Sequence, residues 1–291
     1  MSAEPSTDVL LEVKNLSVRF PVLGGVFLRR RGEVRAVDGV SFSLEKGKTL
    51  AIVGESGSGK SVTAQAIMGL LDPRRSRIDG KVWLEGREVL GLDRREKQAL
   101  MGSRIAMIFQ DPLSSLHPFY RIGDQIVEAI RVHRQIGKAA AHREAIEMLR
   151  RVGIPAVEQR VDDYPHQLSG GMRQRVMIAM ALSCDPRLLI ADEPTTALDV
   201  TIQAQILDLL KRLKRQSGMS LILITHDLGI VAEMCDRVIV MYGGRVVEQG
   251  DVRSIFANPL HPYTEGLLNS IPRIDRPRDK LLVIEGSVPH P

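Results

Sequence analysis

The chain has 291 residues, of which 44% are hydrophobic and 26% are charged. This length and balance predict a globular protein with one large core and a smaller satellite. Its apolar runs fall well short of the ~20 residues that a membrane-spanning helix needs, and its first residues lack the basic-then-apolar pattern of a secretory signal. We therefore expect a cytoplasmic protein, in which Cys184 and Cys235 are ordinary reduced thiols.

The formal net charge is +5, but the Lys and Arg residues are spread along the chain rather than interleaved with aromatic residues in one segment. Nucleic acid is therefore not a required partner. Only residues 28–31 and 74–77 are densely basic. We interpret both runs as solvated loops, and contact with anionic lipid headgroups is the alternative.

Residues 9–20 and 37–44 alternate between apolar and polar side chains, which predicts an antiparallel β layer. The apolar run 50–53 follows, and then a glycine-rich segment opens the helical pattern 62–71. A glycine-rich turn from a strand into a helix is the context of a phosphate-binding loop, whose backbone N–H groups surround a polyphosphate. The segment reads Gly54, Glu55, Ser56, Gly57, Ser58, Gly59, Lys60 and Ser61, followed by Val62.

The last two side chains of this loop carry its chemistry. Lys60 would reach the β- and γ-phosphates of a nucleotide, and the Ser61 hydroxyl would hold Mg²⁺. A plain turn has no need of this pair. The sequence therefore predicts nucleotide binding.

Residues 105–109 read as a strand that leads to Gln110, and residues 122–130 and 141–149 repeat apolar side chains at helical spacing. We assign the two helical stretches to a separate helical subdomain.

A second anion site is predicted at the start of a later helix. Ser169 is a suitable N-cap, and Gly170 and Gly171 leave their backbone amides open to a phosphate.

The buried-strand run 188–191 ends in Asp192 and Glu193. One carboxylate would lie beside Mg²⁺ and the other where an attacking water would sit, which suits hydrolysis. The remaining predicted elements are a helix over 201–216, a strand over 221–225 that leads to His226, and a β-hairpin over 238–248.

Alternation of these strands with helices predicts a parallel sheet covered on both faces. Ligands of such sheets bind beyond the carboxyl ends of the strands. Gly54, Gln110, Asp192 and His226 all fall at such ends, which predicts that they belong to one site.

These ordered motifs resemble those of ABC-type ATPases, the nucleotide-binding subunits of membrane transporters. The resemblance implies an α/β fold, namely a P-loop NTPase (RecA-like) parallel-sheet core with an antiparallel β subdomain and an inserted helical subdomain. It implies a single ABC ATPase domain over 8–291. The parts would be a nucleotide-binding core with its β layer (8–111 and 176–250), a helical subdomain with the signature loop (112–175) and a C-terminal extension (251–291).

The resemblance also implies catalytic roles. Glu193 would polarise the attacking water, His226 would contact the γ-phosphate, and Gln110 would sense Mg²⁺ and water. Ser61, Gln110 and Asp192 would surround Mg²⁺.

Members of this family act as head-to-tail dimers. Ser169, Gly170 and Gly171 would therefore cover the ATP held by a second ABC ATPase subunit, identical or paralogous, and Asp199 would communicate across the dimer. Phe20 is placed either to stack on adenine or to pack as a core phenylalanine.

Within the family, residues 108–116, 169–182, 191–205 and above all 258–268 resemble the oligopeptide/dipeptide importers. The resemblance implies two transmembrane permease chains and, indirectly, a solute-binding protein as partners, at the cytoplasmic face of a bacterial-type inner membrane. Subfamily members often continue past a motif like 284–289 into a Cys-rich tail that can hold an iron–sulfur cluster. This chain stops at Pro291 without such a tail, either because the sequence is shortened or because this member dispenses with it, so we expect no iron–sulfur cluster here. The resemblance implies ATP and Mg²⁺ as the ligands.

Two other functions remain open. A non-transport ABC ATPase acting on nucleic acid or ribosomes usually carries long coiled-coil insertions or two ATPase modules, and this sequence has neither. An exporter ATPase fits the segment 258–268 less well. Co-purification with permease chains, or instead with ribosomes or DNA, would distinguish these possibilities.

Overall fold

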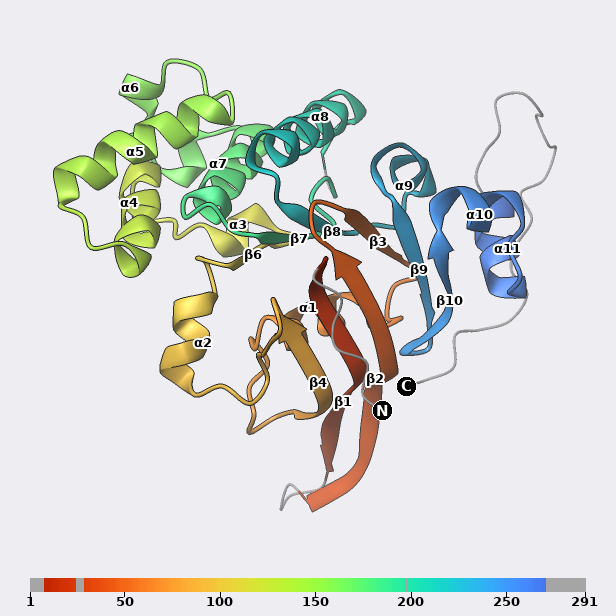
Figure 1. Cartoon of the computed structure of the whole chain (residues 1–291). Helices are drawn as coiled ribbons and strands as arrows, with labels where there is room; N and C mark the ends of the chain where they lie inside the picture. Colours follow the sequence, from red (N-terminus) through yellow and green to blue (C-terminus); the bar gives the residue numbers. More distant parts are fainter. Residues whose placement is uncertain (1–7, 25–28, 197, 271–291) are drawn as a thin grey trace. The chain divides into compact units, whose positions relative to one another are not determined.

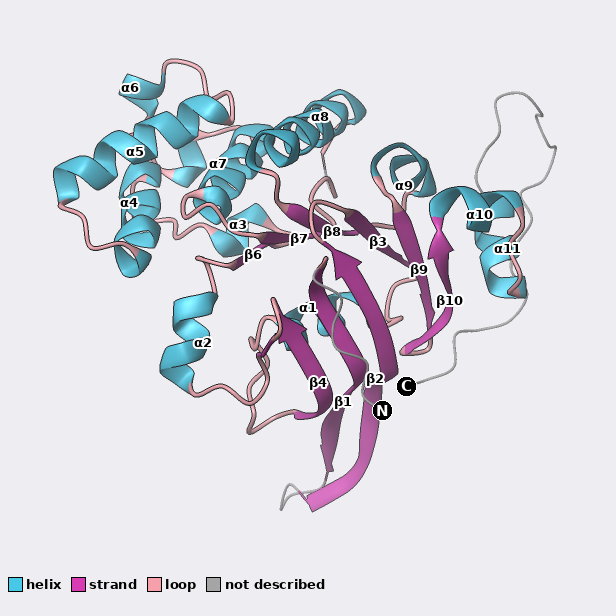
Figure 2. Cartoon of the chain, in the orientation of Figure 1, coloured by secondary structure: helices cyan, strands magenta, loops and turns pink. Residues whose placement is uncertain are grey.

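The computed structural model describes residues 8–24, 29–196 and 198–270, coloured along the chain in Figure 1. The chain divides into two compact units: unit 1 comprises residues 1–92 and 222–291, and unit 2 comprises residues 93–221. Helices predominate in unit 2, whereas strands predominate in residues 8–92 (Figure 2). Within the described ranges, no helix is both long enough and apolar enough to cross a membrane.

Unit 1 contains the predicted antiparallel layer. Its strand order is β2-β1-β4-β5, formed by β1 (Val9–Gly24), β2 (Arg29–Glu45), β4 (Arg77–Leu84) and β5 (Arg87–Glu88). Leu11 and Val13 are buried at alternate positions of β1, and Leu16 and Val18 are buried again beyond an irregularity in the register after Val13. The prediction of an antiparallel β layer is therefore confirmed.

The prediction of a basic loop over 28–31 is wrong for Arg29–Arg31, which belong to β2, and residue 28 lies outside the described residues. Strand β1 continues past Phe20 to Gly24, and Phe20 lies opposite Val34. The second basic run does include a turn, in which the backbone N–H of Arg75 donates to the carbonyl of Asp72.

The second sheet of unit 1 surrounds β3 (Thr49–Val53), which is buried along its whole length. Strand β9 (Arg237–Tyr242) pairs parallel to β3, and β10 (Arg245–Asp251) pairs antiparallel to β9, which confirms the predicted hairpin. The last residues of β8 (Ser220–Ile224) lie on the other side of β3, where the N–H of Thr225 donates to the carbonyl of Ile52 at 3.3 Å. The described part of unit 1 contains the helices α1 (Lys60–Ile67), α9 (Leu228–Met234), α10 (Val252–Ala257) and α11 (Pro262–Asn269).

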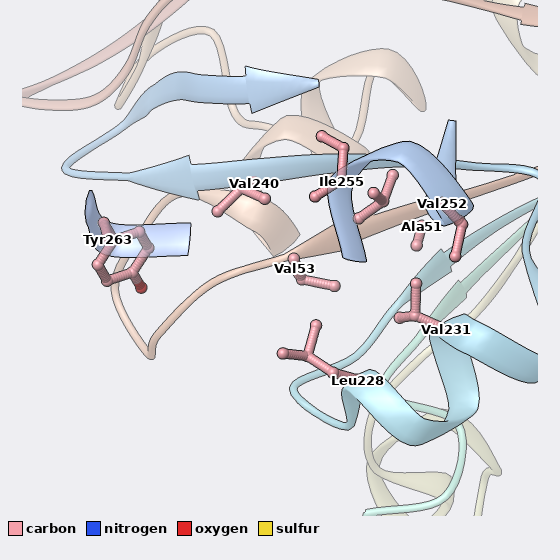
Figure 3. Close-up of a cluster of buried hydrophobic side chains, with 9 residues drawn as sticks. Ala51, Val53, Leu228, Val231, Val240, Val252, Ile255 and Tyr263 are labelled. Carbon is pink, nitrogen blue, oxygen red and sulfur yellow. The ribbon is translucent and has the colours of Figure 1, made fainter. Parts of the chain in front are cut away.

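One hydrophobic cluster joins the phosphate-loop strand to the C-terminal helices of unit 1. Ala51 and Val53 of β3 pack with side chains from α9, β9, α10 and α11 (Figure 3). The cluster consists of Ala51, Val53, Leu228, Val231, Val238, Val240, Val252, Ile255 and Tyr263. The end of β3, where the glycine-rich loop begins, is therefore anchored in packed side chains.

Unit 2 contains β6 (Ile105–Ile108) and β7 (Leu188–Asp192), which pair parallel with Ile108 opposite Ala191. Its helices are α2 (Arg94–Leu100), α3 (Pro112–Ser115), α4 (Ile122–His133), α5 (Lys138–Arg151), α6 (Val157–Arg160), the 3₁₀ helix η1 (Pro165–Gln167), α7 (Gly170–Leu182) and α8 (Val200–Ser217).

The apolar spacing of α4 and α5 predicted their buried faces. Ile122, Ile126 and Ile130 of α4 are fully buried, and so are Ala141 and Leu149 of α5. Unit 2 is wider than the helical subdomain 112–175 because β6, β7 and α8 cluster with these helices. The subdomain bounds of the sequence analysis stay a prediction.

Candidate nucleotide-binding and hydrolysis site

The loop after β3 depends on glycine at its two ends. Gly54 has φ 149° and Gly59 has φ 97°, values that L side chains rarely adopt. A Cβ atom on Gly54 would collide with the carbonyl oxygen of Met241, and one on Gly59 with the carbonyl oxygen of Ala36. Glycine at these positions lets the backbone turn tightly between β3 and α1, as a phosphate-binding loop requires.

Lys60 directs its ammonium group into this loop. The side chain is only 6% exposed, and Nζ donates to the carbonyls of Gly54 at 2.8 Å and Glu55 at 2.7 Å, and to Oγ of Ser58 at 3.3 Å. A buried ammonium is stable only when such acceptors satisfy it. The loop therefore holds a positive charge where an anionic ligand would bind.

The first turn of α1 has features that suit a phosphate. Its N-cap is Gly59, which provides no side-chain acceptor, so no N-cap side chain competes with a ligand for the backbone N–H groups of the first turn. Ser61 and Val62 are half-buried on this turn.

Two contacts on the outer side of the loop were missed by sequence reasoning. The hydroxyl of Tyr263 in α11 accepts a hydrogen bond from the N–H of Glu55 at 2.9 Å. The N–H of Gly244, in the turn of the β9–β10 hairpin, donates to the carbonyl of Ser58 at 3.2 Å. Tyr263 lies 208 residues after Glu55, and Gly244 lies 186 residues after Ser58, and no local pattern reports contacts of this range.

His226 lies in unit 1 just beyond β8. Because β8 neighbours β3, His226 and the glycine-rich loop follow the carboxyl ends of adjacent strands. The imidazole is exposed, and the next residue, Asp227, caps α9 by accepting hydrogen bonds from the N–H groups of Gly229 and Ile230. This position matches the predicted one.

In unit 2, the predicted catalytic residues Gln110 and Glu193 are in contact. Nε2 of Gln110 and Oγ1 of Thr196 each donate to Oε2 of Glu193 at 2.9 Å. Glu193 has φ 45°, which is uncommon for a residue other than glycine, and such backbone strain concentrates at functional sites. Asp192 ends β7 and is 4% exposed. Thr196 was not identified from the sequence, although it lies three residues after Glu193.

The signature segment begins α7 as predicted. Oγ of Ser169 accepts a hydrogen bond from the N–H of Met172 at 3.3 Å, which makes Ser169 the N-cap. A Cβ atom on Gly171 would lie 2.7 Å from Cγ2 of Ile202 in α8, so the close approach of α7 and α8 requires glycine there.

Asp199 is exposed and has a structural role that the sequence did not predict, while its role across a dimer stays a prediction. Its carboxylate caps α8 by accepting a hydrogen bond from the N–H of Ile202 at 3.0 Å. Residue 197 of the same motif lies outside the described residues. Phe20 is half-buried in β1, and both of its interpretations stay open.

Family comparison adds independent information. A family model described as ABC transporter matches residues 37–196, and one described as oligopeptide/dipeptide transporter, C-terminal region, matches residues 247–291. The chain is 53% identical to the oligopeptide transport ATP-binding protein AppD of Bacillus subtilis, over 98% of this chain and 85% of the relative. It is 51% identical to the oligopeptide transport ATP-binding protein OppD of Salmonella typhimurium, over 99% and 84%.

Solved structures lead to the same family. A dimeric ATP-binding cassette in a post-hydrolysis state, bound to ADP and Pi, superposes with a TM-score of 0.73 at 26% identity, over 84% of this chain and 99% of that chain. The predicted P-loop NTPase fold with its antiparallel layer is thereby confirmed. The matching family model covers the phosphate loop, and relatives of this similarity match nearly the whole length of the chain. The chain therefore belongs to the ABC transporter family, whose ATP-binding subunits hydrolyse ATP to drive transport.

Proposed function

We propose that the chain binds and hydrolyses ATP to energise the import of peptides, or of a related small solute, across a bacterial inner membrane. The match of residues 247–291 to the C-terminal region of oligopeptide/dipeptide transporters supports the peptide class. The names of the relatives, oligopeptide and dipeptide transport ATP-binding proteins, support the same class. No comparable observation favours nucleic acid or ribosomes.

The observation that carries the hydrolytic step is the position of Glu193. Its backbone is strained, and one carboxylate oxygen is fixed by Gln110 and Thr196. The carboxylate held in this way would accept a proton from the water that attacks the γ-phosphate. His226 would orient the γ-phosphate, and Lys60 would leave its backbone acceptors to bind the β- and γ-phosphates.

The oxygen donors of the candidate site suit Mg²⁺, which prefers carboxylate, hydroxyl and amide oxygens. Ser61, Asp192 and Gln110 would hold the ion, and the Asp192 side chain among them is 4% exposed. When bound, Mg²⁺ neutralises charge on the β- and γ-phosphates.

A second subunit and two permease chains complete the proposed assembly, at the cytoplasmic face of the membrane. The segment after Gln110 supports a permease contact, because Leu113, Phe119 and Tyr120 are 60%, 82% and 58% exposed. Large exposed apolar side chains that gather in one segment are typical of protein interfaces. Gln125 of α4 fixes this segment by bonding the N–H of His117 and the carbonyls of His117 and Tyr120.

The test replaces Glu193 by glutamine in the transporter assembled with its permease and binding protein. We expect Glu193→Gln to retain ATP while hydrolysis and peptide uptake fall by ~10²-fold or more, as removal of a general base does. The control is Glu88→Gln, which makes the same chemical change at an exposed position in β5.

Unchanged ATP turnover in Glu193→Gln would remove Glu193 from the catalytic role. Purification of the chain with ribosomes or DNA, and without permease chains, would instead contradict the transport function.

A further inference from the structure

The segment 258–268 has no part in the catalytic roles described so far, yet it is attached firmly to unit 1. The carboxylate of Glu248 in β10 accepts hydrogen bonds from the N–H groups of Leu260 at 2.9 Å and His261 at 3.1 Å. Nδ1 of His261 then accepts the N–H of Tyr263 at 3.1 Å, which caps α11. Glu248 of β10 therefore fixes the backbone that leads into α11.

The segment 258–268 places Tyr263 in the hydrophobic core of unit 1. Its side chain is 6% exposed, and its ring centroid lies 4.5 Å from that of Tyr242. Figure 3 shows it at one side of the cluster that contains Val53 and Val240. Burial raises the pKa of Tyr263 to about 12, so its hydroxyl remains a neutral phenol at physiological pH.

The Tyr263 hydroxyl contacts the phosphate loop itself. It accepts the N–H of Glu55 at 2.9 Å, while the carbonyl of Glu55 accepts Nζ of Lys60 at 2.7 Å and the N–H of Ser58 at 3.2 Å. Glu55 is thus bonded at its N–H by α11 and at its carbonyl by the loop lysine. The Glu55 carbonyl is one of the three acceptors that hold Nζ of Lys60, beside the Gly54 carbonyl and Oγ of Ser58.

We propose that Tyr263 is a positioning residue for nucleotide binding, which holds the backbone of Glu55 so that the phosphate loop is shaped before ATP arrives. This inference rests on the proposed function of the loop. A loop that is already ordered loses less conformational entropy on binding, and so its affinity for the ligand is higher. The C-terminal segment 258–268 is, in this role, the outer support of the phosphate loop.

The decisive variant is Tyr263→Phe, which keeps the ring in the cluster and removes the hydroxyl that accepts the Glu55 N–H. The matched control is Tyr242→Phe, which removes a hydroxyl from the neighbouring ring. The full chain is titrated with ATP and Mg²⁺, and backbone amide exchange is followed at Glu55. For Tyr263→Phe we expect ATP affinity to fall about two- to tenfold, the range of one net hydrogen bond.

The same variant should exchange the Glu55 amide faster, while turnover of the assembled transporter at saturating ATP changes less than about twofold, because binding and not chemistry is affected. Tyr242→Phe should change neither the affinity nor the exchange at Glu55.

Unchanged ATP affinity in Tyr263→Phe would overturn the inference. If the melting temperature fell at the same time, Tyr263 would be a residue that stabilises the fold without positioning the loop. If Tyr263→Phe does not fold, amide exchange in the wild-type chain tests the inference instead. Rapid exchange of the Glu55 amide in the folded wild type would overturn it. Absence of ATP binding by the wild type would contradict the proposed function instead, and the exchange at Glu55 would still report the contact with Tyr263.

Discussion

Gly54 leaves no room for a side chain, so a substitution at this residue tests whether the phosphate loop requires glycine there. We expect Gly54→Ala to destabilise the chain by ~3 kcal/mol or more, because strain at positive φ adds ~1–3 kcal/mol to the collision with the carbonyl of Met241. ATP binding should be lost with it. Chemical denaturation followed by circular dichroism measures the change.

Gly57 provides the comparison. It also has positive φ, at 80°, but a Cβ atom there would meet no atom within 4 Å. Gly57→Ala should therefore lose only ~1 kcal/mol of unfolding free energy. If Gly54→Ala and Gly57→Ala lost equal free energies of unfolding, the close approach of Met241 would not be the reason why glycine is needed at position 54.

The sequence predicted the loop, the acidic pair and the N-cap Ser169 because each consists of adjacent residues with fixed spacing. It could not predict that Tyr263 bonds Glu55, because a hydrogen bond between residues 208 positions apart leaves no local pattern. The unusual backbone of Glu193 was equally invisible, since φ 45° in a glutamate is imposed by the surrounding fold. The predicted roles of the site residues stay predictions.

At the scale of elements, Arg245 of β10 links the β9–β10 hairpin to β2. Its guanidinium donates through Nε and Nη2 to Oδ2 of Asp38 at 2.9 and 2.6 Å, and the N–H of Asp38 donates to the carbonyl of Gly244 at 2.8 Å. The hydrogen bond from Arg245 holds the pKa of Asp38 below its usual value of 3.8. A lowered pKa means that the folded state favours the ionised carboxylate.

This link predicts a pH dependence. Because the folded pKa of Asp38 is depressed, the stabilisation is present above the ordinary pKa of 3.8 and is lost as the pH falls below it. At pH 7 we expect Arg245→Ala to lower the free energy of unfolding by ~0.2–1 kcal/mol, since the pair is partly exposed. The difference from wild type should disappear in acid. A difference that is constant with pH would exclude the ionised pair as its cause.

Periodicity predicted α4, α5 and α8 well, because each buries one face. The prediction of a solvated loop over 28–31 failed, because Arg29–Arg31 belong to β2, which pairs with β1. Strand β1 also continues through Pro21. The structure gives the reason: β1 pairs with β4 only as far as Arg19, so Pro21 lies where β1 has β2 as its sole described partner. A missing N–H costs little on an unpaired edge, and a strand can therefore include proline there.

At the scale of the whole molecule, the similar cassette whose structure was solved with ADP and Pi is described as dimeric, and the signature segment is the part of this chain that we expect to act on a partner's ATP. Ser169→Asp tests this, because aspartate is as good an N-cap as serine and α7 should remain stable. The new negative charge would repel the phosphates of an ATP held by the facing subunit.

The isolated full chain should therefore bind ATP with unchanged affinity, because its own phosphate loop is intact. ATP turnover of the assembled transporter should fall by ~10²-fold, since each repelled unit charge in a desolvated interface is worth several kcal/mol. Ser169→Thr, which keeps both the hydroxyl and the cap, should retain most of the activity. If Ser169→Asp weakens ATP binding to the isolated chain as strongly as it slows the transporter, then the segment acts on the chain's own nucleotide, and the head-to-tail arrangement is wrong.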